Sequence, residues 1–235
     1  MNPTRSDIER MLAERLEFLI GIGHDMRSPL TGIAGFASIL AELPSVSGDP
    51  TASEAAAYIR REARLLVELL NQLLDFGQVE QGQPHLEHES IDLVRLVELV
   101  VEPFALRHPD LTFRVLHDED EVAVQGDFLK LNRIVTNLLD NAVAHSPAGT
   151  VISVSVARDD DDVVLTVEDQ GKGVHPEDRT LIFERFVRRS SERPGAGIGL
   201  YVVKGLVDAH GGSVSVDGDQ GARFEVRLPR NSGVS

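Results

Sequence analysis

A histidine with a carboxylate beside it and a proline close behind has the chemistry to carry a phosphoryl group. His24 lies in the sequence HDMRSPL, where Asp25 follows directly, Arg27 comes three residues later and Pro29 five residues later. A neutral imidazole nitrogen is a competent nucleophile toward phosphorus, and a neighbouring carboxylate can take the proton from the other ring nitrogen. The proline removes one backbone donor and lets a helix bend below the histidine. A lone histidine usually has no such role, so this motif alone only suggests a phosphoacceptor.

Three glycines at alternate positions precede a predicted helix far along the chain. Gly195, Gly197 and Gly199 lie in GAGIGL, where backbone N–H groups at the start of a helix suit a phosphate. The spacing differs from the dinucleotide fingerprint, and the chain contains no P-loop motif. The glycines alone are therefore a weak indication of phosphate binding.

A second pair of glycines follows a predicted strand, and two asparagines share one face of a predicted helix. Asp169 precedes Gly171 and Gly173, so its carboxylate can accept from an amino group while the glycines let a flat ring approach the backbone. Asn137 and Asn141 are four residues apart, which places both on one helical face. Such asparagines need a partner, and a magnesium–nucleotide is a suitable one. Structural caps and turns would explain each feature separately, but they explain the whole set poorly.

The first third of the chain has the pattern of two long helices joined by a short loop. Apolar residues recur at spacings of three and four in two stripes, Leu19, Ile22, Met26, Leu30, Ile33, Ala37 and Leu40, then Ile59, Ala63, Leu66, Leu70 and Leu73. The intervening loop is rich in turn formers, with Thr51 or Ser53 available to cap the second helix. A single hairpin cannot bury both stripes, so we expect a homodimer with a four-helix bundle, or else docking on the chain's own second domain. In that bundle His24 would point into solvent.

The rest of the chain alternates between helical and strand patterns. We expect a helical domain over 1–76, a linker over 77–90 and a second domain over 91–235. In the second domain we predict helices at 91–107, 128–146 and from about 198 to 210, and strands at 111–117, 151–157, 162–169, 213–218 and 222–229. These elements predict a two-domain α+β chain whose second domain has helices on one face of a mixed sheet.

The bulk composition limits the classes of function. The 235 residues carry a net charge of -15, which disfavours nucleic acid and anionic membrane surfaces as partners. The chain has no cysteine, which excludes disulfides and thiolate metal sites and fits a reducing cytosol. We find no apolar run long enough to cross a bilayer and no signal peptide, so we expect a soluble cytoplasmic chain without membrane contact.

Taken in order, the motifs resemble those of the histidine kinase core, over about residues 10–230. HDMRSPL resembles the phosphoacceptor box, and NLLDNAVAHS the asparagine box of the ATP-binding domain shared with gyrase, Hsp90 and MutL. VEDQGKGV, LIFERF and GAGIGLYVVK resemble the first glycine box, the phenylalanine box and the second glycine box. Five motifs in family order are a specific signal.

The resemblance implies a protein-histidine kinase of two-component signalling with a Bergerat-type ATP site. ATP would phosphorylate His24, with Asp25 as general base and Arg27 beside the phosphorylated state, and a response regulator's aspartate would receive the phosphate. The resemblance implies the following ATP contacts: Asp169 for the adenine amino group, Asn137 for magnesium, Asn141 for the phosphate side, Gly171 and Gly173 for the base, Gly195, Gly197, Gly199 and Leu200 for the triphosphate, and Phe183, Arg185 and Phe186 in a mobile lid. The chain could also be the cytoplasmic part of a larger or membrane-bound sensor.

The sequence departs from the family pattern at three positions. Many relatives carry lysine and tyrosine where this chain has Ala144 and His145, so His145 or a lid arginine would replace one phosphate contact. Four residues after the histidine the family commonly has threonine or asparagine, which is thought to position water for dephosphorylating the partner. Here that residue is Ser28, so we expect any phosphatase activity to be weak.

Two other functions are compatible with parts of this pattern. An ATP-hydrolysing conformational machine like the gyrase relatives would share the ATP site but would have no use for HDMRSPL. A degenerate kinase acting as a dimeric scaffold is the second alternative, suggested by Ala144.

Overall fold

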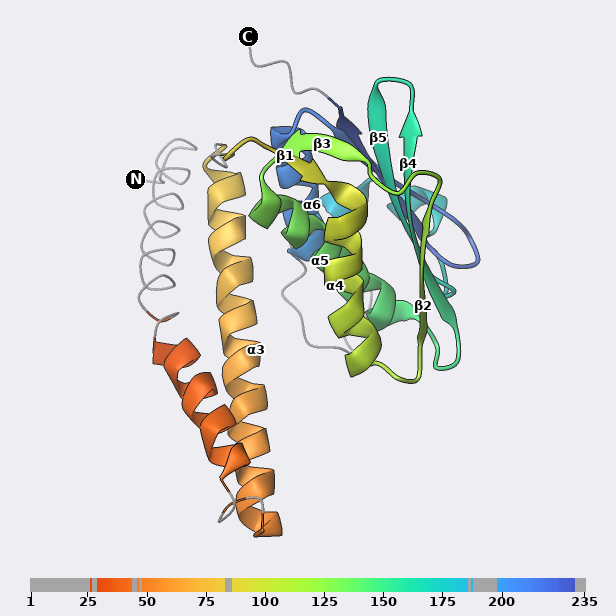
Figure 1. Cartoon of the computed structure of the whole chain (residues 1–235). Coiled ribbons are helices and arrows are strands. Elements are labelled where there is room, and N and C mark those ends of the chain that lie inside the picture. Colours follow the sequence, from red (N-terminus) through yellow and green to blue (C-terminus); the bar gives the residue numbers. More distant parts are fainter. Residues whose placement is uncertain are drawn as a thin grey trace, which may run out of the picture. The chain divides into compact units, whose positions relative to one another are not determined.

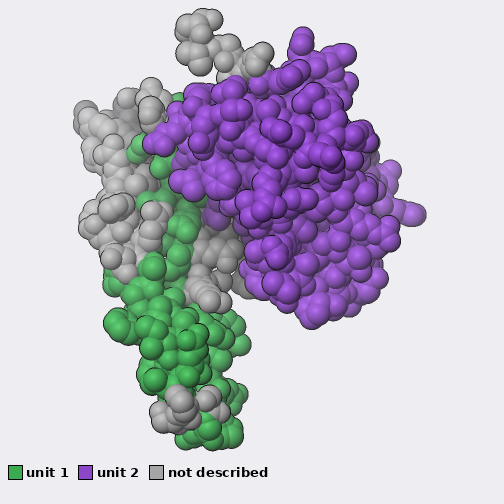
Figure 2. All heavy atoms as spheres, viewed as in Figure 1, with its two compact units in different colours: residues 1–82 green, residues 83–235 purple. Residues whose placement is uncertain are grey.

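The chain divides into two compact units, residues 1–82 and residues 83–235 (Figure 2). The computed structural model describes residues 26, 29–43, 46, 48–82, 86–185, 187 and 198–230. Within these residues, no helix combines the length and the apolar character that crossing a membrane requires.

The first unit contains a helix over residues 29–42 and a second, longer helix, α3 (Pro50–Glu80). Asp49 caps α3, because its carboxylate accepts from the backbone N–H groups of Thr51 and Ala52 at 2.9 and 3.3 Å. The expected cap at Thr51 or Ser53 is therefore wrong. Pro50 fits the first helical position, where its missing N–H costs nothing, and the helix begins before both hydroxyl residues.

A five-stranded mixed sheet organises the second unit, in the spatial order β2-β4-β5-β7-β6. Its strands are β2 (Thr112–His117), β4 (Val151–Asp159), β5 (Asp162–Glu168), β6 (Ser213–Asp217) and β7 (Arg223–Pro229). β2 pairs with β4 in parallel, and the other neighbours are antiparallel, with Leu165 of the central strand opposite Val156 and Val226. This mixed sheet confirms the predicted α+β class.

Three helices lie on one side of this sheet (Figure 1). They are α4 (Leu93–Arg107), α5 (Phe128–His145) and α6 (Gly199–Ala209). Their apolar faces are buried against alternate residues of the strands, such as Ile152, Val154 and Val156 of β4. The α6 helix ends at Ala209 with His210 as its C-cap, and Gly211 follows in the left-handed conformation at φ +73°, as the glycine pair predicts.

A second, two-stranded sheet was not expected from the sequence. β1 (Glu89–Asp92) pairs antiparallel with β3 (Ala123–Gly126), with Ile91 opposite Val124. Consequently α4 begins at Leu93, after Asp92 has capped it, and not at residue 91. The α3 helix extends to Glu80, so four residues of the expected linker are helical.

Candidate functional site

Asp169 is the buried acid of the second unit that points into a pocket. It follows β5 directly, and its own N–H donates to the Ala222 carbonyl at 2.9 Å. One carboxylate oxygen, Oδ1, accepts from the N–H groups of Gly171 and Ala222 at 2.8 and 3.1 Å. The other oxygen, Oδ2, is buried and makes no hydrogen bond within the described part of the chain. A buried acceptor without a partner is costly, so this oxygen is suited to a donor on a ligand.

Gly171 and Gly173 give this loop a surface without side chains. A Cβ on Gly171 would lie 2.6 Å from the carbonyl oxygen of His145, and one on Gly173 would lie 2.6 Å from that of Gly218. Gly173 also has a φ of +74°, which other residues adopt only with strain. The two glycines therefore let this loop pack directly against other backbone segments next to Asp169, and Gly173 lines the pocket there.

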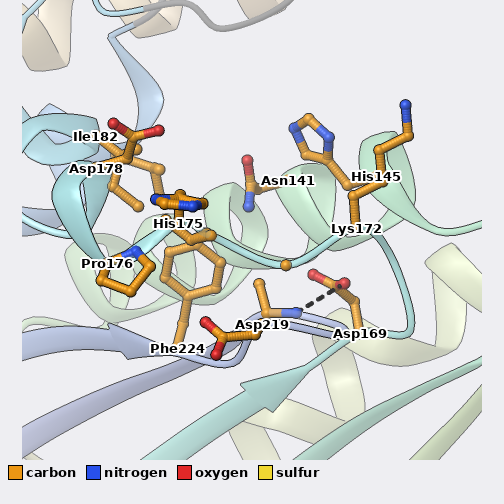
Figure 3. A pocket seen from close by; sticks show the side chains of 14 residues that line it. Asn141, His145, Asp169, Lys172, His175, Pro176, Asp178, Ile182, Asp219 and Phe224 are labelled. Atoms are coloured by element: carbon orange, nitrogen blue, oxygen red, sulfur yellow. Dashed lines mark hydrogen bonds between the residues drawn. The ribbon is translucent and has the colours of Figure 1, made fainter.

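A pocket of about 660 Å³ lies over this loop (Figure 3). Its volume falls in the usual range for small-molecule sites. The apolar residues of its wall are Val174, Pro176, Ile182, Leu200, Ala222 and Phe224, and its polar side chains are Asn141, His145, Asp169, Lys172, His175, Asp178 and Asp219. An apolar cavity with one buried acceptor on its floor can hold a flat heterocycle that bears an amino group.

The start of α6 lies beside the α5 asparagines. Asn137 is buried, and its Nδ2 donates to the Gly199 carbonyl at 3.4 Å. Asn141, one turn further along α5, lines the pocket together with Leu200. The N-cap residue of α6 is Ile198, whose side chain cannot accept the first N–H groups of the helix. These N–H groups suit an anion.

The predicted lid begins with two short 3-10 helices, η1 (Pro176–Asp178) and η2 (Leu181–Phe183). Phe183 is buried, and its ring meets the ring of Phe224 edge to face, with centroids 6.4 Å apart. Phe183 therefore anchors this segment to the sheet, whereas Arg185 is exposed.

The structure brings together most of the predicted nucleotide contacts that it describes. Asn141, Asp169, Gly173 and Leu200 line one pocket, and Gly171, Asn137 and Gly199 lie next to it. The remaining predicted site residues lie outside the described residues: His24, Asp25, Arg27, Ser28, Phe186, Gly195 and Gly197.

Sequence reasoning predicted the hairpin of β6 and β7 but not that its turn belongs to the site. This turn contributes Asp219 and Ala222 to the pocket, and Phe224 of β7 lies behind them. Its two glycines, Gly218 and Gly221, have φ values of +103° and +86°. A tight turn with two glycines was visible in the sequence DGDQGA, but only the sheet order places it beside Asp169.

The buried residues Asp127 and His210 join the N-terminal end of α5 to the C-terminal end of α6. Nε2 of His210 accepts from the Asp127 N–H at 3.1 Å, and its Nδ1 lies 2.7 Å from the Leu206 carbonyl, which can only accept. The ring is therefore neutral, with its hydrogen on Nδ1. Burial lowers the pKa of His210 below its ordinary value, although the Leu206 carbonyl and the Asp127 carboxylate oppose this shift.

The carboxylate of Asp127 links two segments, the start of α5 and the segment around Glu87. Oδ1 accepts from the Lys130 N–H as the cap of α5, and Oδ2 accepts from the Glu87 N–H, both at 3.0 Å. Burial alone would raise the pKa of Asp127, but its backbone hydrogen bonds and the nearby Lys130 outweigh burial and lower it. The pair therefore holds the segment that enters the second unit against both helices of the site.

Two family models match consecutive parts of the chain. Residues 14–82 match the His Kinase A (phospho-acceptor) domain, and residues 126–232 match the histidine kinase-, DNA gyrase B- and HSP90-like ATPase. One match lies in each unit, and residues 83–125 lie between the two matches.

Individual relatives give the same result. The chain is 32% identical to the alginate biosynthesis sensor protein KinB of Pseudomonas aeruginosa, over 92% of this chain and 37% of that protein. It is 32% identical to the sensor histidine kinase TrcS of Mycobacterium tuberculosis, over 97% of this chain and 48% of that protein. The chain thus spans less than half the length of these curated relatives.

Solved structures share the fold. The mycobacterial sensor histidine kinase MprB is 35% identical, with a TM-score of 0.56 over 61% of this chain and 97% of that chain. Full-length ShkA in complex with AMPPNP is 29% identical, with a TM-score of 0.72 over 91% of this chain and 45% of that chain.

Proposed function

The chain belongs to the sensor histidine kinases of two-component systems, and we propose that it transfers the γ-phosphate of ATP to its own His24 and then to an aspartate of a response regulator. The observation that carries the proposal is the buried, unpartnered Oδ2 of Asp169 on the floor of the pocket. It is a fixed acceptor at the place where the amino group of adenine would lie. ATP as the substrate is also the reason to place this chain in the cytoplasm.

The binding roles follow from the positions of the side chains. Asp169 accepts from the adenine amino group, and Gly171 and Gly173 let the ring lie against the backbone. Asn141 and the start of α6, with Gly199 and Leu200, lie on the phosphate side. Gly195 and Gly197 would continue this phosphate site, and Phe183, Arg185 and Phe186 would belong to the lid that covers it.

Asn137 fits a magnesium ion bound together with the phosphates. Magnesium prefers oxygen ligands, and its protein sites often supply one or two of them while phosphate and water complete the shell. The Oδ1 of Asn137 is such an oxygen, held on a buried helix face beside Gly199. The ion would offset phosphate charge in a chain whose net charge is -15.

Transfer to His24 asks mainly for positioning and charge neutralisation. Asp25 would take the proton from the imidazole, and Arg27 would lie beside the phosphorylated ring. Ser28 retains a hydroxyl but lacks a methyl group, so removal of phosphate from the response regulator would be slow.

We further propose that the first unit forms a homodimer through its two helices. In the single chain the small residues Ala37 and Ala63 are buried, whereas Ile33, Leu40 and Leu66 remain nearly half exposed. A second copy that covers these larger side chains would complete a four-helix bundle.

Labelled ATP tests the proposed reaction. The wild-type chain should acquire an acid-labile, alkali-stable label that is lost in His24→Gln and passes to a response regulator. His85→Gln is the matched control, since it changes another histidine of the same chain and should keep the label.

Two outcomes would point to other functions. Steady phosphate release without a labelled protein would favour an ATP-hydrolysing machine, and no ATP binding at millimolar concentration would favour a scaffold.

A further inference from the structure

Arg179 joins three segments around the pocket. It lies between η1 and η2, and its Nη1 is 2.7 Å from Oδ1 of Asp217 while its Nη2 is 2.8 Å from Oδ1 of Asp219. Its Nε donates to the Val174 carbonyl at 3.3 Å. The Arg179 side chain is 28% exposed, whereas the side chains of Asp217 and Asp219 are each 75% exposed, so a partly buried guanidinium holds two carboxylates that face solvent and one carbonyl.

The segments that Arg179 joins are the two walls of the pocket and the base of the lid. Asp219 belongs to the turn between β6 and β7, which lines the pocket, and Val174 belongs to the loop that follows Asp169. The turn and the loop also share backbone hydrogen bonds, from Val174 N–H to the Gly218 carbonyl and from Gly221 N–H to the Gly171 carbonyl, both at 2.9 Å. Arg179 adds a charged side-chain link from the lid to this pair.

Gly218 and Gly221 let the backbone of the turn lie so close to the backbone of Asp169 that no side chain would fit between them. A Cβ on Gly221 would lie 2.2 Å from the Asp169 carbonyl oxygen, and one on Gly218 would lie 2.2 Å from the Gly221 carbonyl oxygen. Since no side chains fill this contact, the backbone of the turn sets the position of Ala222, which donates to Asp169. A shift of the turn would therefore move the acceptor that would bind adenine.

Charge gives Arg179 a second role at the same place. Asp219 lines the pocket, and its carboxylate would repel an anionic ligand. The guanidinium of Arg179 offsets that charge, although Arg179, unlike Lys172, does not line the pocket. The ion pair between Arg179 and Asp219 thus fixes the position of the turn and also reduces the negative charge at the pocket wall.

We propose that Arg179 is a positioning residue for nucleotide binding, which sets the turn between β6 and β7 and the base of the lid before the nucleotide arrives. This role rests on the proposed ATP site. Arg179 acts through Asp217, Asp219 and Val174 and does not touch the nucleotide. Preorganisation of this kind strengthens binding because less ordering remains to be done on association.

Calorimetry on the full chain tests the proposal with Arg179→Ala. We expect the Kd for ATP to rise about two- to fivefold, the range for an ion pair whose carboxylates face solvent. The KM for ATP in autophosphorylation should rise by the same factor, while kcat at saturating ATP stays unchanged. Arg179→Lys, which keeps the charge but loses the fork, should give a smaller rise in Kd.

Arg158→Ala is the matched control. Arg158 is 32% exposed and pairs with Glu119 at 2.9 Å in the same unit, but it is not part of the pocket wall. It should leave the Kd unchanged. An equal rise in Kd for Arg158→Ala, or none for Arg179→Ala, would overturn the proposal.

The choice of nucleotide separates positioning from direct contact. Because Arg179 supports the wall on the base side, binding of AMP should weaken as well as binding of ATP in Arg179→Ala, with a somewhat larger factor for ATP because the uncompensated Asp219 repels the more highly charged ligand. A loss confined to ATP would mean that Arg179 contacts the phosphates, and the proposal would be wrong.

A double-mutant cycle provides a second variant. Asp217→Ala alone should weaken ATP binding, but in the Arg179→Ala background it should have no further effect. Additive losses would contradict the link. If the wild-type chain itself binds no ATP, the proposed function is wrong. If the wild-type chain binds ATP and the variants at Arg179 and Asp217 bind it equally well, only the positioning role of Arg179 is wrong.

Discussion

The two units differ in how far they bury their own large apolar side chains. The second unit contains all of the largest fully buried residues of the described chain, among them Phe224, Leu138 and Leu165. In the first unit, Phe36, Ile39 and Tyr58 are more than half exposed. The second unit completes its core within a single chain, whereas the described part of the first unit leaves large apolar side chains exposed.

This difference implies that the two parts of the proposed kinase depend on a second copy of the chain to different degrees. The nucleotide site lies in the self-contained unit, so its geometry does not depend on a second copy. The proposed phosphoacceptor His24 belongs to the unit with uncovered apolar side chains, so we expect its environment to depend on association.

The largest expected effect tests whether the first unit needs a second copy. Leu66→Asp would place an unpaired carboxylate at each of two equivalent positions of the bundle, at a cost of about 3 kcal/mol or more for each. We expect a dimer in the wild type and a monomer in the variant by analytical ultracentrifugation. The matched control is Leu106→Asp on α4 of the second unit, where an 80% exposed leucine should tolerate the change. Equal effects of the two substitutions would remove the contrast between the units.

A core truncation tests the other side of the comparison. Leu165 is 1% exposed on the central strand β5, so Leu165→Ala should lower the free energy of unfolding by about 2–5 kcal/mol. Because this core lies within one chain, the loss measured by urea unfolding should not depend on protein concentration. A loss that shrinks as concentration rises would show that association stabilises this unit as well.

The sequence predicted the long elements of the second unit because each has a clear period. Alternation in β4 and β7 and the 3.6-residue stripe of α5 correspond to the observed burial of alternate residues and of one helix face. The strands β1 and β3 were missed because each has four residues, and Ile91 of β1 also fits the helical pattern that follows. Such short strands form because they pair with each other, and the pattern of apolar residues within either segment does not reveal this pairing.

The candidate site shows the same division between local and tertiary signals. Asp169, Gly173 and Asn141 were found because each belongs to a contiguous motif, and all three line one pocket. Arg179 and Asp219 were missed, since an arginine and an aspartate 40 residues apart carry no mark of their pairing. Only the order of β5, β7 and β6 in the sheet brings the two together.

Removing the charge of Asp169 should affect the second unit's function far more than its stability. In Asp169→Asn the amide oxygen can still accept from Gly171 and Ala222, but its NH₂ group would face the adenine amino group donor to donor. We expect the Kd for ATP to rise about 100-fold, since a buried donor would lose its partner. Calorimetry measures this, with the neighbouring exposed Glu168→Gln as the control that should bind normally. Equal binding by both variants would contradict the role of Oδ2.

The smallest expected effect is a dependence of stability on pH that arises at one histidine of the second unit. Burial lowers the pKa of His210, so the folded chain keeps this ring neutral while the unfolded chain protonates it below about pH 6.5. The unfolded state then binds more protons, and the free energy of unfolding falls as pH drops from 6.5 toward the folded pKa. The slope from this group is at most about 1.4 kcal/mol per pH unit.

His210→Gln isolates this contribution from the other titrating groups, which include the neighbouring His88 and Asp127. Glutamine can still accept from the Asp127 N–H but does not titrate. Urea unfolding of the full chain at pH 7.5 and 5.5 should therefore show a smaller loss in the variant than in the wild type. If both lose the same free energy between these pH values, His210 is not held neutral, and the sensitivity of this unit to acid lies elsewhere.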